Sequence, residues 1–166
     1  MVQISNIVCS AELGIPVDLK KFARRATNVV YDAQKHNVVL WRQRNIGGHC
    51  FVYARGKLVC NGSVASKSEA VKRLRRYARK IQQMGYEVQF YKFKILTISL
   101  FHDCGRPLDL TALKGARYEP ELFPGAIISA GPVRFTCFHS GKVIISGVKK
   151  RSHLHRYVYP VLKRLL

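Results

Sequence analysis

The stretch Gly56-Lys57-Leu58-Val59-Cys60-Asn61-Gly62 has a counterpart with the same pattern, G-K-x-x-x-x-G, in Gly141-Lys142-Val143-Ile144-Ile145-Ser146-Gly147. Both copies enclose a run that favours a β-strand between two glycines. Signals on either side repeat in the same order. Tyr31 recurs 87 residues later as Tyr118, and a further set recurs 91 residues later: Ile4, Ile7, Val17, Asp18 and Leu19 as Ile95, Ile98, Leu108, Asp109 and Leu110. A repeat of about 80 residues is too long for a solenoid unit, so we predict a pseudo-twofold domain with repeats 1–91 and 92–166.

The charge of the chain is strongly positive. It has 29 Lys and Arg against 9 Asp and Glu, a formal net charge of +20 on 166 residues. Residues 1–91 hold 16 basic and 5 acidic residues, and residues 92–166 hold 13 and 4, so both repeats carry the excess. Self-repulsion of this size opposes a compact fold, which indicates a polyanionic partner. Nucleic acid is favoured over an anionic membrane surface; a highly soluble, solvated surface is the third reading.

The composition permits a packed core inside the cell. Hydrophobic residues make up 48%, with only 12 Gly and 6 Pro. No run of 18 apolar residues occurs, and the N-terminal residues lack the pattern of a secretory signal. The five cysteines form no C-x-x-C pair and are expected to be small buried hydrophobes in a reducing compartment: Cys9, Cys50, Cys60, Cys104 and Cys137. We therefore expect an intracellular protein.

The hydrophobic periodicity predicts the same order of elements in each repeat: strand, helix, four strands, helix. In the first repeat Asp18 caps a short helix to about Ala26, and Ser66 with Glu69 opens a long helix to about Met84. The basic residues of the long helix, Arg73 among them, are placed mostly on its solvated face. The predicted strands are 4–11, 28–31, 38–44, 50–54 and 57–61. The second repeat is predicted to have a strand over 88–101, a helix over 108–114, four further strands and a helix from about Arg151.

This pattern predicts an antiparallel α+β sheet of ten strands with four helices on one face. The other face carries alternate residues that are apolar or form hydrogen bonds: Phe51, Tyr53, Val59, Asn61, Thr136, Phe138, Ile144 and Ser146. An open face with large aromatic residues needs a partner. The alternative is a second buried core, as in a sandwich.

The string Tyr118-Glu119-Pro120-Glu121-Leu122-Phe123-Pro124-Gly125 resembles the signature of the TATA-binding protein family. It lies in the second repeat, as in that family. Further matches follow in order over nearly the whole chain: Asn6-Ile7-Val8, Leu19-Lys20-Lys21, the two glycine-lysine stretches, Tyr77-Ala78-Arg79 and Tyr159-Pro160. The resemblance implies a saddle, a curved ten-stranded antiparallel sheet with four helices on its convex face. It also implies a nuclear transcription initiation factor that binds and bends promoter DNA and nucleates the preinitiation complex. Minor-groove bending is a property of that family itself and is carried over with the resemblance.

The resemblance also implies which residues contact DNA. Wedge residues that enter a base step are Phe123 and Phe138 in the second repeat, and His36 and Tyr53 occupy the matching positions of the first. The groove floor would be formed by Asn6, Val8, Phe51, Val59, Asn61, Thr97, Ser99, Thr136, Ile144 and Ser146. Arg42, Arg44, Lys57 and Lys142 would hold phosphates. The family has a second asparagine at Thr97 and an aliphatic residue at Ser99, so a looser preference for TATA sequences is expected.

Two partner sites are implied in the same way. Glu119, Glu121 and Leu122 correspond to the segment that docks transcription factor IIB in the family. The basic face of the 66–84 helix and the 38–44 strand correspond to a surface for a IIA-type factor, and TBP-associated factors are further candidates. The alternative function is a docking platform with weak or non-TATA DNA binding.

The sequence lacks the residue patterns of an enzyme or a metal protein. His102-Asp103-Cys104 and His153-Leu154-His155 do not have zinc-site spacing, and no second cluster completes a ligand set. No paired carboxylates suggest a metal-dependent nuclease. We therefore predict a non-enzyme without cofactor, metal or small-molecule substrate. No basic amphipathic anchor or RNA-recognition motif supports a membrane-surface or RNA-binding module.

Overall fold

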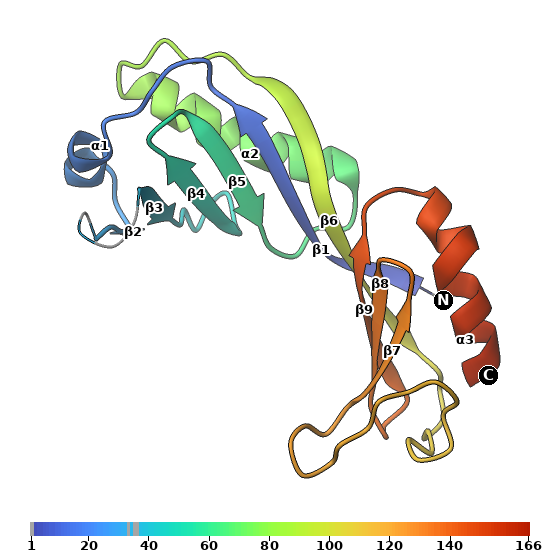
Figure 1. Ribbon diagram of the computed structural model, residues 1–166. Helices are drawn as coiled ribbons and strands as arrows, with labels where there is room; N and C mark the ends of the chain where they lie inside the picture. The colour runs from blue at the N-terminus through green and yellow to red at the C-terminus, as the bar shows by residue number, and fades with distance from the viewer. Residues whose placement is uncertain (1, 33, 35–36) are drawn as a thin grey trace. The chain divides into compact units, whose positions relative to one another are not determined.

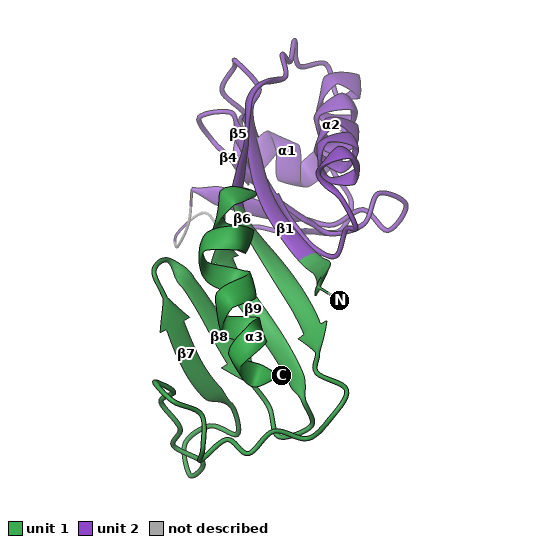
Figure 2. Cartoon of the chain, turned by 90° about the vertical axis from the view of Figure 1, so that its right-hand side faces the viewer, with its two compact units in different colours: residues 1–5, 97–166 green, residues 6–96 purple. Residues whose placement is uncertain are grey.

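The computed structural model describes residues 2–32, 34 and 37–166 (Figure 1). The chain divides into two compact units (Figure 2). Unit 1 comprises residues 1–5 and 97–166, and unit 2 comprises residues 6–96. Each unit is a piece of antiparallel sheet with its helices on one face.

Unit 2 contains most of the first repeat. Its elements are β1 (Val2–Glu12, from Asn6 onward), α1 (Leu19–Arg25), β2 (Val29–Val30), β3 (Val38–Trp41), β4 (His49–Tyr53), β5 (Lys57–Asn61) and α2 (Lys67–Gln83). The strand order is β2-β3-β4-β5-β1, and neighbours are antiparallel. Both predicted helix starts are present. The Asp18 carboxylate accepts a hydrogen bond from the Lys21 amide (3.2 Å), and the Ser66 hydroxyl accepts one from the Glu69 amide (3.2 Å).

The core of unit 2 lies between the helices and the sheet. Phe22 of α1, Trp41 of β3 and Tyr77 of α2 are almost completely buried and stack edge to face. Their ring centroids are 4.9 Å apart for Phe22 and Trp41, and 5.1 Å apart for Trp41 and Tyr77. Such aromatic pairs add to the stability that burial of their area provides. This aromatic trio therefore anchors both helices to β3.

Unit 1 contains most of the second repeat. Its elements are β6 (Tyr91–Asp103, from Thr97 onward), β7 (Ala126–Ala130), β8 (Val133–Cys137), β9 (Lys142–Val148), a π-helical turn (Leu154–Val158) and α3 (Tyr159–Leu165). The strand order is β6-β9-β8-β7, with the first residues of β1 beside β6, where the Ser5 hydroxyl donates to the Ser99 carbonyl (3.1 Å). Figure 2 shows α3 lying across one face of this sheet. Its buried residues Val161, Leu162 and Leu165 join the core beneath it, together with Val158 of the π-helical turn.

The predicted ten strands and four helices are not matched. The described residues form nine strands and three α-helices. The missing strand lies before β7, where Arg117 and Ile127 form only an isolated bridge, with N–H to carbonyl distances of 2.8 and 2.9 Å. Strands 28–31 and 38–44 are shorter than predicted, since β2 is Val29–Val30 and β3 ends at Trp41.

The missing helix is the one predicted over 108–114. There the Asp109 carboxylate accepts from the amide (3.1 Å) and hydroxyl (2.6 Å) of Thr111, which closes a turn two residues on. In α1 the equivalent Asp18 bonds the amide three residues on, as a helix cap does. Gly115, with φ of +74°, then ends the segment. The prediction was wrong because the same carboxylate can close a turn or cap a helix.

Among the described residues, no helix is long and apolar enough to span a membrane.

Candidate nucleic-acid interface

Each unit presents one face of its sheet away from its helices, and we call this the open face. In unit 2 it carries a row of residues in register, Leu40, Phe51 and Val59 on β3, β4 and β5. In unit 1 the equivalent row is Ile127, Thr136, Ile144 and Phe101 on β7, β8, β9 and β6. These side chains are half-buried or exposed, whereas their neighbours along each strand are buried under the helices. The open face is therefore not a second core in either unit.

The predicted floor residues of unit 2 lie on this face. Val8, Phe51, Val59 and Asn61 are half-buried, and Tyr53 at the end of β4 is 37% exposed. Asn6 is fixed by its own side chain, because its amide oxygen accepts a hydrogen bond from the Gly62 amide at 2.8 Å. Because that bond engages the side-chain oxygen of Asn6, its side-chain nitrogen is the group that can donate to a ligand.

The predicted floor residues of unit 1 also lie on its open face. Ile144 is 45% exposed, while Thr136 and Ser146 are half-buried beside it. Thr97 and Ser99 lie on β6, and the pairing of β6 with β9 is irregular between Ile98 and Leu100, so Ser99 sits at the irregularity. A bulge of this kind re-aims the side chains next to it.

The two phenylalanines predicted as wedges meet in unit 1. The ring centroids of Phe123 and Phe138 lie 6.1 Å apart at an interplanar angle of 63°, and Phe123 is 43% exposed. Gly125 makes this possible, since a Cβ there would come within 2.7 Å of the Phe123 ring and 3.3 Å of the Phe138 ring. The matching residue His36 lies outside the described residues.

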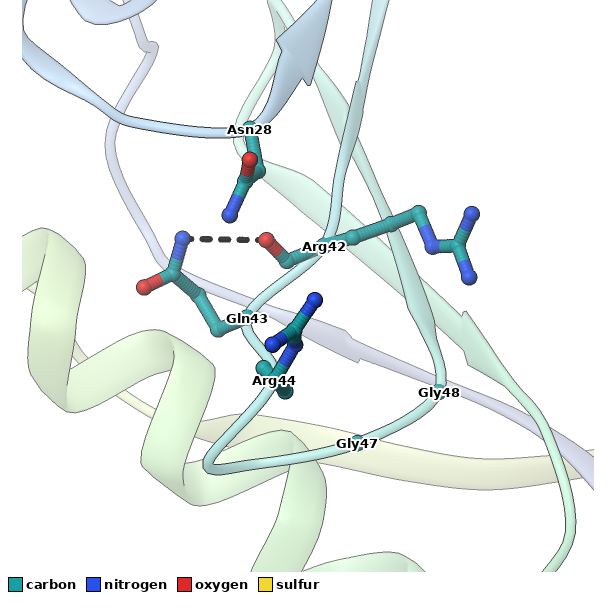
Figure 3. Close-up of a pocket in the computed structure, with 6 residues that line it drawn as sticks. All are labelled: Asn28, Arg42, Gln43, Arg44, Gly47 and Gly48. Carbon is teal, nitrogen blue, oxygen red and sulfur yellow. Dashed lines mark hydrogen bonds between the residues drawn. The ribbon is translucent and has the colours of Figure 1, made fainter.

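Arg42 and Arg44 line a pocket of about 460 Å³ in unit 2, together with Asn28, Gln43, Gly47 and Gly48 (Figure 3). Gln43 is buried and holds the segment in place. Its side-chain nitrogen donates to the carbonyls of Arg42 and Thr27 (both 3.0 Å), and its oxygen accepts from Lys80 Nζ (3.1 Å). Both arginines are exposed on either side of this anchor. In Figure 3 the Arg42 side chain extends away from Gln43.

Lys57 and Lys142 lie at equivalent places, each at the start of a strand, and each faces an acidic residue on the neighbouring strand. Lys57 pairs in register with Glu12, and Lys142 pairs with Asp103. The Asp103 carboxylate accepts from the Gly105 amide at 2.9 Å and so shapes its own turn. These acidic neighbours were not anticipated from the sequence, although Glu12 and Asp103 are 91 residues apart like the other repeated positions.

The segment predicted to bind a partner forms an exposed turn. The amides of Leu122 and Phe123 both donate to the Glu119 carbonyl, at 2.9 and 3.0 Å. The Glu119 carboxylate forms an ion pair with Arg117 (2.8 Å). Glu121 is exposed, and Leu122 is 79% exposed at the tip. Leu122 is the most exposed large hydrophobic side chain among the described residues.

The cysteines and histidines do not form a reactive site in the described part of the chain. All five thiols are free, and four are buried. Burial raises the pKa of Cys60 to about 12 and that of Cys137 to about 11. No cluster of three or more His, Cys, Asp or Glu residues suited to a metal ion occurs among the described residues.

Several open-face residues were missed from the sequence alone, namely Leu40, Phe101 and Ile127, together with Gly125. The repeat itself contained the signal, because Leu40 and Ile127 are separated by the same 87 residues as Tyr31 and Tyr118. Arg73 was placed on the solvated face of its helix and is instead buried, at 5% exposure. Arg73 lies three residues after Ala70 and four before Tyr77, which are both on the buried stripe, so the stripe is one position wider than predicted.

Comparison with known proteins agrees with this geometry. The family model for transcription factor TFIID, or TATA-binding protein, matches residues 1–84 and 92–166. The chain is 36% identical over 173 residues to TATA box-binding protein-like 2 of Rattus norvegicus, covering 97% of this chain and 49% of that protein. It is equally 36% identical to the TATA-box-binding protein of Xenopus tropicalis, covering 97% of this chain and 57% of the other. The chain thus spans about half the length of the curated relatives it matches.

Among solved structures, the Methanococcus jannaschii TBP superposes with a TM-score of 0.84 at 25% identity, covering 99% of this chain and 97% of that one. The fold is therefore that of TBP. Sequence and structure together show that this chain belongs to the TATA-binding protein family of transcription factors.

Proposed function

We propose that the open faces of the two units bind the minor groove of A·T-rich promoter DNA and that the protein nucleates assembly of the transcription initiation machinery. The observation that carries this proposal is the pair of equivalent rows on the open faces, apolar or hydroxyl-bearing and partly exposed. Within the row of unit 1, Ile144 is 45% exposed, and the nearby wedge residue Phe123 is 43% exposed. A minor groove offers an apolar wall and acceptor atoms, which such a surface complements. Each repeat, 1–91 and 92–166, would contact one half of the DNA site.

The preference for A·T pairs follows from the chemistry of the floor. Asn6 presents its amide nitrogen, and Thr97, Thr136 and Ser146 present hydroxyls, and all of them can donate to the acceptors at the edge of A·T pairs. A G·C pair adds an amino group there, which would press on Val59 and Ile144 and leave a polar group buried without a partner. Val8, Phe51, Asn61 and Ser99 complete this floor in the proposal.

Bending requires a wedge, and unit 1 offers the better one. The Phe123 and Phe138 rings carry no polar atom, so they can enter a base step without desolvating one. At the other end Tyr53 has a hydroxyl and His36 an imidazole, and burying such a group unpaired costs roughly 1–3 kcal/mol. We infer a deeper kink at the Phe123–Phe138 end and a fixed orientation on DNA.

Basic residues would hold the DNA backbone. The pocket with Arg42 and Arg44 has the charge for a phosphate, and the planar guanidinium groups suit its oxygens. Lys57 and Lys142 would contact phosphates at equivalent places in the two repeats. Their acidic neighbours Glu12 and Asp103 would orient them and limit binding by charge alone.

The partner sites are part of the same proposal. Leu122 and Glu121 at the exposed turn would dock a IIB-type factor. The exposed basic residues of α2 and the 38–44 segment would contact a IIA-type factor. TBP-associated factors would bind at other surfaces. The complex would form in the nucleus. Glu119 already forms an ion pair with Arg117, so the test variant changes the two other residues, as Glu121→Lys with Leu122→Ala. Pull-down of a IIB-type factor should be lost while DNA affinity is kept; unchanged pull-down would remove this site from the proposal.

The experiment that tests the DNA-binding proposal is a titration of three duplexes at one salt concentration: TATA, A·T-rich without TATA, and G·C-rich. We expect tightest binding to the TATA duplex, intermediate binding to the A·T-rich one and weakest binding to the G·C-rich one. Equal affinity for all three would contradict minor-groove readout. That outcome would favour the alternative, a docking platform whose DNA contact is electrostatic.

A further inference from the structure

The final helix of unit 1 repeats the burial pattern of α2 from Leu74 to Arg79 and at Ile81. Tyr77, Ala78 and Ile81 of α2 are buried, and so are Val161, Leu162 and Leu165, each 84 residues further on. The exposed positions match in the same frame, as Arg79 and Lys163 are both exposed. The helix faces of the two units can therefore be compared position by position.

This comparison shows that unit 1 lacks the aromatic trio of unit 2. By the 91- and 87-residue spacings of the repeat, Phe22 and Trp41 correspond to Leu113 and Ile128. By the burial pattern of the helices, Tyr77 corresponds to Val161. Three rings are replaced by three smaller aliphatic side chains. The helix that carries Phe22 is also absent, because residues 108–114 form turns.

A pocket of about 420 Å³ lies at this place in unit 1. Its walls are Ala112, Leu113, Ile128, Val161 and Leu165, and two basic residues, Lys114 and Arg164, line it as well. Ile128, Val161 and Leu165 are at most 4% exposed, so the floor is part of the core, while Ala112 and Lys114 lie at the surface. In unit 2 the corresponding positions carry the three packed rings of Phe22, Trp41 and Tyr77.

The helical segment that forms one wall of the pocket is positively charged. Residues 149–166 contain six Lys or Arg residues and two His, and no Asp or Glu: Lys149, Lys150, Arg151, His153, His155, Arg156, Lys163 and Arg164. Lys114 adds a further positive charge on the opposite wall. An occupant must therefore combine a large apolar group with flanking negative charge.

We propose that this pocket binds one aromatic side chain from an acidic segment of a partner protein. The aromatic ring takes the place that Phe22 and Trp41 fill in unit 2, and acidic residues on either side meet Lys114 and Arg164. A flipped nucleobase is disfavoured, since the two polar side chains of the lining, Lys114 and Arg164, can only donate hydrogen bonds and would leave the donor groups of a base unpaired. This site is separate from the open face that we propose for DNA.

The probe for this proposal is a short fluorescein-labelled peptide of Asp, Glu and Ser with one central Trp, compared with the same peptide carrying Ala. Binding is measured by fluorescence anisotropy to the whole chain at about 0.15 M salt, where weak surface attraction is screened. We expect the Trp peptide to bind at least about tenfold more tightly, as burial of one aromatic side chain implies. Two variants, Leu113→Trp and Lys114→Glu with Arg164→Glu, fill the pocket or reverse its charge, and each should remove this advantage.

The control is Lys72→Glu with Arg79→Glu, which makes the same change in net charge on exposed positions of α2. It should keep the preference for the Trp peptide. Thermal unfolding and DNA affinity of Leu113→Trp verify that the variant is folded and that the DNA site is intact. Equal affinity for the two peptides would overturn the proposal, and so would an undiminished Trp preference in folded Leu113→Trp. Displacement of the Trp peptide by a single-stranded oligonucleotide at equal charge concentration would assign the pocket to nucleobases instead.

Discussion

Three thiols lie in register on the helix side of unit 2: Cys9 on β1 pairs with Cys60 on β5, which pairs with Cys50 on β4. Burial removes these groups from water, and this desolvation costs the charged thiolate more free energy than the neutral thiol. The pKa of Cys60 is raised to about 12 for that reason, with the opposing effect of nearby Arg73 being smaller. The thiols are thus neutral, inert members of the core at physiological pH.

A pH dependence of stability follows from the raised pKa of Cys60. In the unfolded chain this thiol ionises near its ordinary pKa of 9.0, but in the folded protein only near 12. Its contribution is therefore complete below about pH 9 and is lost as pH rises toward 12. Between about pH 8 and about pH 10 the free energy of unfolding should fall by roughly 1 kcal/mol more in the wild type than in Cys60→Val. Urea unfolding at both pH values measures this, and identical losses in the two proteins would refute it.

Arg73 is the opposite case, a charge retained in the core. The residue is 5% exposed, one guanidinium nitrogen donates to the Ile7 carbonyl at 3.3 Å, and Nε has no hydrogen-bond partner among the described residues. A buried charge without a carboxylate partner is costly. We expect the free energy of unfolding of Arg73→Met to be at least that of the wild type, with a gain of up to roughly 1–3 kcal/mol. Arg73→Ala should be less stable than Arg73→Met, because the smaller side chain leaves a cavity. If urea unfolding finds both variants equally unstable, the charge itself is needed.

At the scale of elements, the repeated glycines explain why the glycine-lysine stretch marks the fold. Gly56 joins β4 to β5 and Gly141 joins β8 to β9, with φ of +93° and +94°. A Cβ on Gly56 would collide with the carbonyl oxygen of Ile15, and one on Gly141 with that of Arg106. Both turns thus need a left-handed residue without a side chain, because another loop passes against them.

This geometry predicts unequal costs for three glycine substitutions. Gly85 has a similar φ of +99° but open space around it. Gly85→Ala should therefore cost about 1 kcal/mol from backbone strain alone, whereas Gly56→Ala and Gly141→Ala should each cost more than about 2 kcal/mol. Thermal or urea unfolding of the three variants gives the comparison. Three equal losses would mean that the close approach of the loops does not contribute.

The sequence predicts an element correctly where its residues favour a single local structure. The capped helix α2 and strands such as β5 follow directly from capping residues and alternation. The 108–114 segment does not, since the Asp109 carboxylate closes a turn with Thr111. The open-face residues of the site were predictable from alternation and the repeat. The burial of Arg73 and the acidic neighbours of Lys57 and Lys142 depend on packing and register that no local pattern determines.

At the scale of the whole molecule, the net charge of +20 should make DNA affinity fall steeply with salt. If Lys57 and Lys142 hold phosphates, alanine at either position should flatten the log–log slope by about one unit and weaken all sequences alike. Lys72→Ala provides the control, because Lys72 is exposed on α2, on the helix side of unit 2. A slope that is unchanged in Lys57→Ala and Lys142→Ala would remove these lysines from the interface.

The most direct test of minor-groove binding by the open faces is energy transfer between dyes at the two ends of a TATA duplex, measured at saturating protein. Wild-type protein should bring the duplex ends closer together. Phe123→Ala with Phe138→Ala should leave the duplex nearly straight, whereas His36→Ala with Tyr53→Ala should change little, because only the phenylalanines enter a base step without burying a polar atom. A duplex that stays straight when saturated with wild-type protein, or that bends equally with the double phenylalanine variant, would contradict this account.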